Sequence, residues 1–287
     1  MYCLGGFILK ITCIFCGKEK ESSREHIIPN AICANNPDFI TENVCKDCNS
    51  QLGATIDSKF VNSPQIEFKR AALKQKGHKG DYPQPLKHVT DSDGTEIIFD
   101  HNFESKIIPR IKKIDENNYT VLANSEKEAD KIAQKKAIRL NQKYQKTSVT
   151  EINKSRVNIC IRKNLDTPYF EVEFLKIAFE YINTYYADTY RQDPTGNNLK
   201  TILNQFKSGN KVNYSDYIEK VSLKKDIPLF NKPNKTYHVI TAIPDPKGKL
   251  WIGILLYNGI FSYRVLVSNN KDRYPKIISK SKVIDIS

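Results

Sequence analysis

The sequence predicts a mixed α+β fold, in which a small N-terminal module stabilised by zinc precedes a larger α+β domain with a small C-terminal antiparallel sheet. Two Cys-x-x-Cys pairs within the first 50 residues predict the zinc-stabilised module. Helix-like and strand-like segments separated by turns predict the mixed domain. The chain has 287 residues, of which 39% are hydrophobic, and this length is sufficient for two domains.

The cysteine pairs are Cys13 with Cys16 and Cys45 with Cys48. Each pair can turn two thiolates toward one ion, and four cysteines suit a single tetrahedral Zn²⁺. Two local disulfides are the alternative, but two intervening residues make a strained bridge and nothing in the chain suggests secretion. A short polar segment gains little from hydrophobic burial, whereas a structural zinc supplies on the order of 10 to 16 kcal/mol of apparent binding energy. We therefore expect a structural zinc with no open coordination position.

The segment between the cysteine pairs contains an adjacent acid and histidine, Glu25 and His26. Neighbouring side chains on an extended segment point to opposite faces, so the two residues would act at different places unless the strand bends there. On spacing alone, His26 is as readily a packed histidine beside the zinc knuckles as a functional group. The ordinary uses of Glu25, Asn43 and Asn49 are those of a surface acid, a turn residue and a helix cap.

Several motifs in fixed order resemble the HNH endonuclease family over roughly the first 60 residues. They are EHIIP, an asparagine just ahead of the second cysteine pair in TENVC, and the CxxCN that ends in Asn49. The leucine-glycine and Ile-Asp pairs that follow, at Leu52, Gly53, Ile56 and Asp57, resemble one branch of this family. The resemblance implies a ββα-metal module, in which a hairpin and a helix grip a catalytic metal.

The resemblance also implies roles for four residues. His26 would be the general base that takes a proton from the attacking water, and Asn43 would help to orient it. Glu25 and Asn49 would bind one catalytic divalent cation. The family name expects a histidine at the position of Asn49, and an asparagine oxygen there suits Mg²⁺ or Mn²⁺.

One family feature is missing from the sequence. The lysine often found shortly after the second knuckle is replaced by Gln51 and Leu52, which leaves one phosphate contact unassigned. The remaining roles are chemically consistent, because phosphodiester hydrolysis needs an activated water and a cation at the leaving oxygen. Neutral His26 can accept a proton near pH 7, and a cation held by Glu25 and Asn49 can stabilise the departing 3′ oxygen.

The composition favours a polyanionic partner. The net charge is +13 and the isoelectric point is about 9.2, so we expect binding to DNA or RNA. With the resemblance to endonucleases, the partner that we expect is double-stranded DNA. A merely basic surface is the alternative, since runs such as Lys135-Lys136 and Lys224-Lys225 are typical of solvated faces. No stretch is long and apolar enough to cross a membrane. The three cysteines left over, Cys3, Cys33 and Cys160, fit a reducing cytoplasm.

We expect two domains, an HNH module at residues 1–75 and an α+β domain at residues 85–287, separated by the loop GHKGDYPQP. The second domain is expected to select the target or to form a homodimer. The hydrophobic pattern and turn residues predict one helix in the first domain and a series of elements in the second. These are helices from Gln65 to Lys74, from Ser125 (a capping box) to Leu140 and through Phe170 to Tyr185, and strands near 96–99, 106–112, 118–123, 156–161, 236–244, 250–259 and 261–268.

The helix through Phe170 to Tyr185 is predicted to be amphipathic, with an aromatic stripe that belongs to the core rather than stacking on bases. Its segment FLKIAFEYINTYY also resembles a stretch that follows the nuclease module in this branch of the family. We therefore expect the two domains to form a joint architecture.

The sequence leads to one principal hypothesis, a metal-dependent DNA endonuclease. The resemblance implies restriction, phage defence or mobile elements as the setting. A second hypothesis is a non-catalytic zinc-containing nucleic-acid-binding protein, in which Glu25 and His26 brace the knuckles. A third is an RNA nuclease, because the same metal chemistry does not distinguish the sugars.

Overall fold

The computed structural model describes residues 10–33, 39–77, 80–86, 89–91, 94–100, 102–151, 159–160, 167–222, 232, 234–278 and 280–287. The chain forms two compact units. Unit 1 comprises Met1–Asp81 together with Leu165–Ser287, and unit 2 comprises Tyr82–Asn164. This division differs from the expected domains 1–75 and 85–287, because residues 165–287 pack with the N-terminal module.

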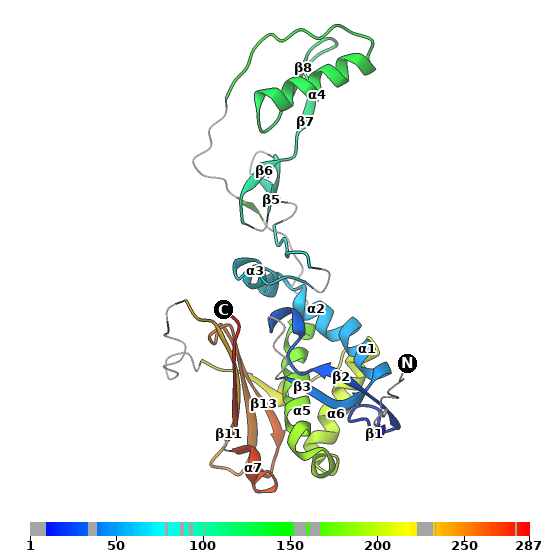
Figure 1. The fold of residues 1–287 in the computed structure, drawn as a ribbon, viewed down its shortest axis with the longest axis vertical. Helices are drawn as coiled ribbons and strands as arrows, with labels where there is room; N and C mark the ends of the chain where they lie inside the picture. Colours follow the sequence, from blue (N-terminus) through cyan, green and yellow to red (C-terminus); the bar gives the residue numbers. More distant parts are fainter. Residues whose placement is uncertain are drawn as a thin grey trace, which may run out of the picture. The chain divides into compact units, whose positions relative to one another are not determined.

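The N-terminal part of unit 1 is a three-stranded antiparallel sheet followed by helices (Figure 1). The strands, in the order β1-β2-β3, are β1 (Lys10–Thr12), β2 (Glu19–His26) and β3 (Ile40–Cys45). The helices that follow are α1 (Lys46–Leu52), the π-helical turn η2 (Gly53–Asp57), α2 (Ser58–Val61) and α3 (Pro64–Ala72). The hairpin β2-β3 followed by α1 is the predicted ββα arrangement. The last helix begins at Pro64, whose fixed φ and missing N–H suit a first helical position.

The C-terminal part of unit 1 contains two long helices and a five-stranded antiparallel sheet. The helices are α5 (Thr167–Tyr190) and α6 (Pro194–Lys207), with the short α7 (Pro275–Ile278) near the end of the chain. The strands, in the order β10-β13-β12-β11-β14, are β10 (Ile218–Lys220), β11 (Tyr237–Pro244), β12 (Leu250–Leu256), β13 (Phe261–Ser268) and β14 (Ser281–Asp285). The three predicted strands are confirmed as the centre of this sheet, and β10 and β14 add its edges.

Helix α5 is the core of unit 1. One side contacts β3, η2 and α2, and another contacts β12 and β13 (Figure 1). The expected aromatic stripe is buried as predicted, with Phe174 and Tyr181 nearly inaccessible to solvent. The expectation of an amphipathic helix is wrong, however, because residues 172–183 are buried all around the helix. The face with charged side chains packs against the N-terminal module instead of facing solvent.

Unit 2 contains two small antiparallel sheets and one helix. The first sheet has the order β6-β5-β4-β9, with β4 (Val89–Asp91), β5 (Glu96–Phe99), β6 (Ser105–Ile107) and β9 (Ile159–Cys160). The second pairs β7 (Arg110–Lys113) with β8 (Tyr119–Leu122), and α4 (Glu126–Arg139) follows. The single strand expected at 106–112 is divided into β6 and β7 on either side of Pro109, which lacks a backbone donor.

Helix α4 begins near the predicted position. The Ser125 side chain accepts a hydrogen bond from the Glu128 N–H at 3.2 Å. The Glu128 carboxylate in turn accepts from the Asn124 N–H at 2.9 Å, one residue earlier than in a standard capping box.

Some expectations concern residues outside the described part of the chain. These are the first nine residues with Cys3, most of the strand at 156–161 with the side chain of Cys160, and Lys224-Lys225. Among the residues that the structure describes, no helix has the length and apolar character required to span a membrane.

His238 on β11 links the C-terminal sheet to the N-terminal module. Its Nδ1 accepts from the Tyr257 N–H at 3.0 Å, so Nε2 carries the proton and donates to the Ile32 carbonyl at 3.0 Å. The ring is fully buried, and this burial lowers the pKa of His238 to about 4. Protonation of Nδ1 would break the bond from Tyr257 and would place an unpaired charge in the core.

We predict that His238 makes folding depend on pH. Its pKa is depressed in the folded state, so the unfolded chain binds the proton more readily and stability falls as pH drops from about 6.5 toward 4. This group alone should remove about 2 kcal/mol of unfolding free energy between pH 7 and pH 5. Urea unfolding should show a smaller loss for His238→Gln, which keeps a donor for Ile32 but does not titrate. Equal losses in the two proteins would contradict this role.

Candidate metal centre and active site

Four cysteines, two from before β2 in the sequence and two from the end of β3 and α1, form one cage. Cys13 and Cys16 lie in the turn after β1, whereas Cys45 ends β3 and Cys48 lies in α1. Gly17 closes the first knuckle with a positive φ of 70° and donates its N–H to the Cys13 carbonyl at 2.9 Å. The four sulfur atoms all lie within 4.8 Å of one another, and no disulfide joins them. The cage can hold one metal ion, as the sequence spacing predicts.

The surroundings of the cage favour the thiolate form of Cys13. The Cys45 N–H donates to Cys13 Sγ at 3.4 Å, and Lys207 Nζ on α6 lies 3.4 Å from Cys48 Sγ. A hydrogen bond from Cys48 lowers the pKa of Cys13 to about 4, whereas the Cys13 thiolate raises the pKa of Cys48. Because four sulfurs without other ligands match the tetrahedral preference of zinc, the donor set fits a structural Zn²⁺.

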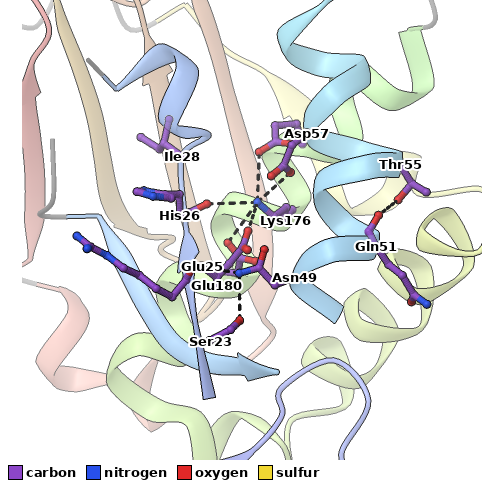
Figure 2. Close-up of polar contacts among 12 residues, drawn as sticks. Ser23, Glu25, His26, Ile28, Asn49, Gln51, Thr55, Asp57, Lys176 and Glu180 are labelled. Carbon is purple, nitrogen blue, oxygen red and sulfur yellow. Dashed lines mark hydrogen bonds and ion pairs between the residues drawn. The ribbon is translucent and has the colours of Figure 1, made fainter. Parts of the chain in front are cut away.

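Glu25 and His26 lie at the end of β2, where the pairing with β3 is irregular. Ser23 pairs with Val44, but Glu25 pairs with Thr41, so β3 contains one extra residue opposite β2. Figure 2 shows the Glu25 carboxylate directed toward Lys176 and the His26 ring directed away from it. The two side chains therefore lie on opposite faces of the strand, as its two-residue period predicts.

Lys176 of α5 is the centre of a buried ion-pair network (Figure 2). Its Nζ lies 2.8 Å from Glu25 Oε1 and 3.0 Å from Asp57 Oδ1. It also donates to the His26 carbonyl at 3.3 Å. Glu173 and Glu180 on the same helix approach Nζ to 3.9 and 3.7 Å. The ammonium of Lys176 thus joins three elements, namely the end of β2, the π-helical turn η2 and its own helix α5.

Four carboxylates around one ammonium cannot all be ionised in a buried site without a large energetic cost. Burial raises the pKa of Glu173 and Glu180 well above the usual value. Burial also raises the pKa of Glu25, and the charge of Lys176 opposes this shift. Burial alone would lower the pKa of Lys176, but the surrounding carboxylates raise it well above its usual value. The ionised form is therefore disfavoured most strongly at Glu173 and Glu180, and the carboxylates closest to Lys176 are those of Glu25 and Asp57.

The two predicted asparagines have different surroundings. Asn49 on α1 lies on the Glu25 side of β2 (Figure 2), and its Nδ2 donates to Ser23 Oγ and to the Arg24 carbonyl, each at 3.0 Å. Its amide oxygen is thereby turned away from these groups. Asn43 Nδ2 donates to the Asn183 carbonyl on α5 at 3.2 Å. Within the described residues no hydrogen bond joins Asn43 to His26, so its side chain fixes β3 against α5.

The His26 ring is half-buried, and its Nδ1 has no hydrogen-bond partner among the described residues. Burial lowers the pKa of His26 below 6.5, and the positive charges of Arg24 and Lys176 contribute to the shift. The ring is therefore neutral near pH 7. A neutral imidazole is able to accept a proton, although Nδ1 itself is buried from solvent.

Sequence reasoning missed the charges on α5. Lys176 lies 150 residues from the His26 carbonyl to which it donates. A signal was present, because Glu173, Lys176 and Glu180 recur at helical spacing within an otherwise apolar stretch. Charges in such a helix need partners, and the sequence does not show which ones.

We predict that Lys176→Met strongly destabilises unit 1. The substitution preserves most of the side-chain volume but leaves ionised carboxylates without a cation, which typically costs about 3 to 5 kcal/mol. Urea unfolding should show this loss, whereas Lys18→Met, at an exposed position of the first knuckle, should change stability by less than about 0.5 kcal/mol. If Lys176→Met were as stable as Lys18→Met, the network would not be stabilising the fold.

We also predict one zinc per chain, bound by the cage. Elemental analysis of the purified protein should find one equivalent, and Cys48→Ser should lower it, because a hydroxyl is a much poorer zinc ligand than a thiolate. The matched control is Cys33→Ser, since Cys33 is buried outside the cage. A full equivalent of zinc in the Cys48 variant would contradict the assignment.

Comparisons with known proteins agree with this arrangement. Residues 13–65 match the model of the HNH endonuclease family, and this segment contains the cysteine cage, Glu25, His26 and Asn49. No curated protein and no solved structure matched the chain. The matched segment coincides with the β2-β3 hairpin, α1 and η2, and its cysteines converge as a metal-binding cage. Residues 13–65 are therefore similar to the HNH endonuclease family and carry a cysteine cluster that could hold zinc.

Proposed function

We propose that this chain is a metal-dependent endonuclease that hydrolyses DNA phosphodiester bonds. The observation that carries the proposal is the family match over residues 13–65, together with a neutral, unpartnered imidazole at His26. Restriction or phage defence is the setting that we propose for this activity. The net charge of +13 supports a nucleic-acid substrate.

In the proposed reaction, His26 accepts the proton of the attacking water through its imidazole ring. Its pKa is depressed, so the basic form predominates at neutral pH. Glu25 and Asn49 would hold one Mg²⁺ or Mn²⁺, because a carboxylate and an amide oxygen on one side of β2 form the hard donor set that these ions prefer. When bound, the cation would neutralise the charge that develops on the phosphate and the leaving oxygen.

Lys176 and Asp57 act as positioning residues in this proposal. Lys176 fixes one Glu25 oxygen at 2.8 Å and the His26 carbonyl at 3.3 Å. The backbone of both catalytic-motif residues is thereby held in one place relative to α1 and its Asn49. A misplacement of about 1 Å in such a site can reduce the rate about 10²-fold.

A non-catalytic nucleic-acid-binding protein is the second candidate. The observation that favours it is the opposite direction of the His26 ring and the Glu25 carboxylate (Figure 2). In that case the two residues would only brace the module. RNA as substrate is tested in the same assay, since the module itself supplies no feature that separates the sugars.

We predict that the purified protein nicks plasmid DNA with Mg²⁺ or Mn²⁺ and that a chelator stops the reaction. His26→Ala should lower the rate by at least about 10²-fold, because removal of a general base typically has this effect. Glu25→Gln should require more metal, whereas Glu19→Gln, on the same strand but exposed, should behave as the parent. Cleavage of RNA alone would redirect the proposal to RNA, and DNA binding without any cleavage would favour the non-catalytic protein.

We also predict that the rate of DNA nicking begins to fall at a lower pH than an ordinary histidine base would give. His26 acts in its neutral form, and its lowered pKa keeps this form populated below the ordinary histidine range. The rate of DNA nicking should therefore be constant from pH 8 to about 6.5 and should fall only at lower pH. An apparent pKa above 6.5 for the catalytic base would contradict the depressed value.

A further inference from the structure

Helix α4 of unit 2 presents a row of four cations to solvent. None of its residues is buried, and Lys127, Lys131, Lys135 and Arg139 are all exposed. They follow one another at intervals of four residues. Within the described part of the chain, none of the four forms an ion pair or a side-chain hydrogen bond.

The acidic residues of the same helix are engaged elsewhere. Glu126 and Asp130 both bind Lys146 Nζ, at 2.6 and 2.7 Å. Asp130 also accepts from the Tyr144 hydroxyl at 2.6 Å, and Glu128 accepts from the Asn124 N–H at 2.9 Å. These acidic side chains thus have partners of their own, and none of them forms an ion pair with a cation of the basic row.

Helix stability does not account for the row. Positions i and i+4 are neighbours on a helix surface, so the row contains like-charged pairs, each of which destabilises a helix by about 0.2 to 0.5 kcal/mol. Lys135 and Arg139 are near the C-terminus, where the helix dipole favours cations, but Lys127 and Lys131 are in the first half of α4. An anionic partner would turn these repulsive contacts into favourable ones.

The dimensions of the row match a nucleic-acid backbone. Four residues rise about 6 Å along a helix, so the row extends about 18 Å and stays on one half of the helix surface. One strand of B-DNA carries a phosphate about every 3.4 Å along the duplex axis, so about five phosphates fall within this length. A hollow beside the row is lined by Lys127, Lys131 and Gln134 together with the acids Glu126 and Asp130, so it does not add to the basic surface.

We infer that this basic row of α4 binds the phosphate backbone of double-stranded DNA. The choice of DNA rests on the proposed function, but the row need not take part in the chemistry. Unit 2 would then contribute affinity without reading the sequence, because phosphate contacts carry no base information. This assigns to α4 a phosphate-binding role outside the HNH segment at residues 13–65.

The test measures binding to a short DNA duplex by fluorescence anisotropy at several salt concentrations, in the full chain carrying His26→Ala to prevent cleavage. In this background Lys127, Lys131 and Lys135 are changed together to Gln, which preserves helix propensity. The slope of log affinity against log salt should become shallower by about 2 to 3, because each phosphate contact contributes about 0.9. Far-UV circular dichroism checks that the helix is retained.

Two control proteins make the result specific. The same three positions changed to Arg should keep the parent slope, because the charge is retained. Lys220, Lys276 and Lys280, three exposed lysines of unit 1, should have little effect when changed to Gln. An unchanged slope in the α4 variant, an equal loss in the unit 1 control or no DNA binding by the parent would each overturn the inference.

The binding experiment can reject the basic row without rejecting the proposed nuclease function, and the reverse also holds. Parent protein that cuts DNA, combined with an unchanged slope in the α4 variant, would reject the basic row and leave the nuclease standing. A changed slope combined with no cleavage by the wild-type chain would reject the nuclease and leave the row as a DNA-binding surface. Tighter binding of an RNA duplex than of the DNA duplex would overturn the choice of DNA.

Discussion

The buried contact of Lys176 with Glu25 and Asp57 is the interaction on which the arrangement of unit 1 depends. Its ammonium has no access to solvent, and an unpaired charge in such a place would be very costly. Lys176 is therefore stable in this position only when the end of β2, η2 and α5 pack against one another. Because Nζ also donates to the His26 carbonyl, the position of the catalytic-motif backbone follows from the same contact. The N-terminal segment is thus completed by a helix from a distant part of the chain.

The cysteine cage fixes the other end of the hairpin. It joins the turn after β1 to the start of α1, and Lys207 of α6 contacts one of its sulfurs. The strand β2 is therefore held near its beginning by the cage and at its end by Lys176, with Asn49 bound to its backbone between them. Short sheets with few apolar residues gain rigidity from such anchors. A fixed strand end is what a hydrolytic site requires, since positioning supplies much of its rate.

The sequence predicts features that depend on local spacing. The two Cys-x-x-Cys pairs give the cage, and the strand period correctly places Glu25 and His26 on opposite faces. The central strands of the C-terminal sheet follow from their apolar alternation and turns. Features that depend on packing between residues far apart in the sequence could not be predicted from it. The periodicity of α5 identifies the aromatic face but not the second partner that buries Lys176, and for the same reason the expected domain division differs from the observed units. The contact of Asn43 with Asn183, 140 residues away, has no local signal either.

We propose that the end of β2 forms a metal-dependent phosphodiesterase site held by Lys176. The most direct measurement is the anomalous diffraction of Mn²⁺ in crystals of the His26→Ala chain bound to duplex DNA. We expect one manganese ion bound by Glu25 and Asn49, at about 2.2 Å from a DNA phosphate oxygen. Manganese bound elsewhere, or a manganese ion at Glu25 and Asn49 without a DNA phosphate oxygen among its ligands, would contradict this assignment.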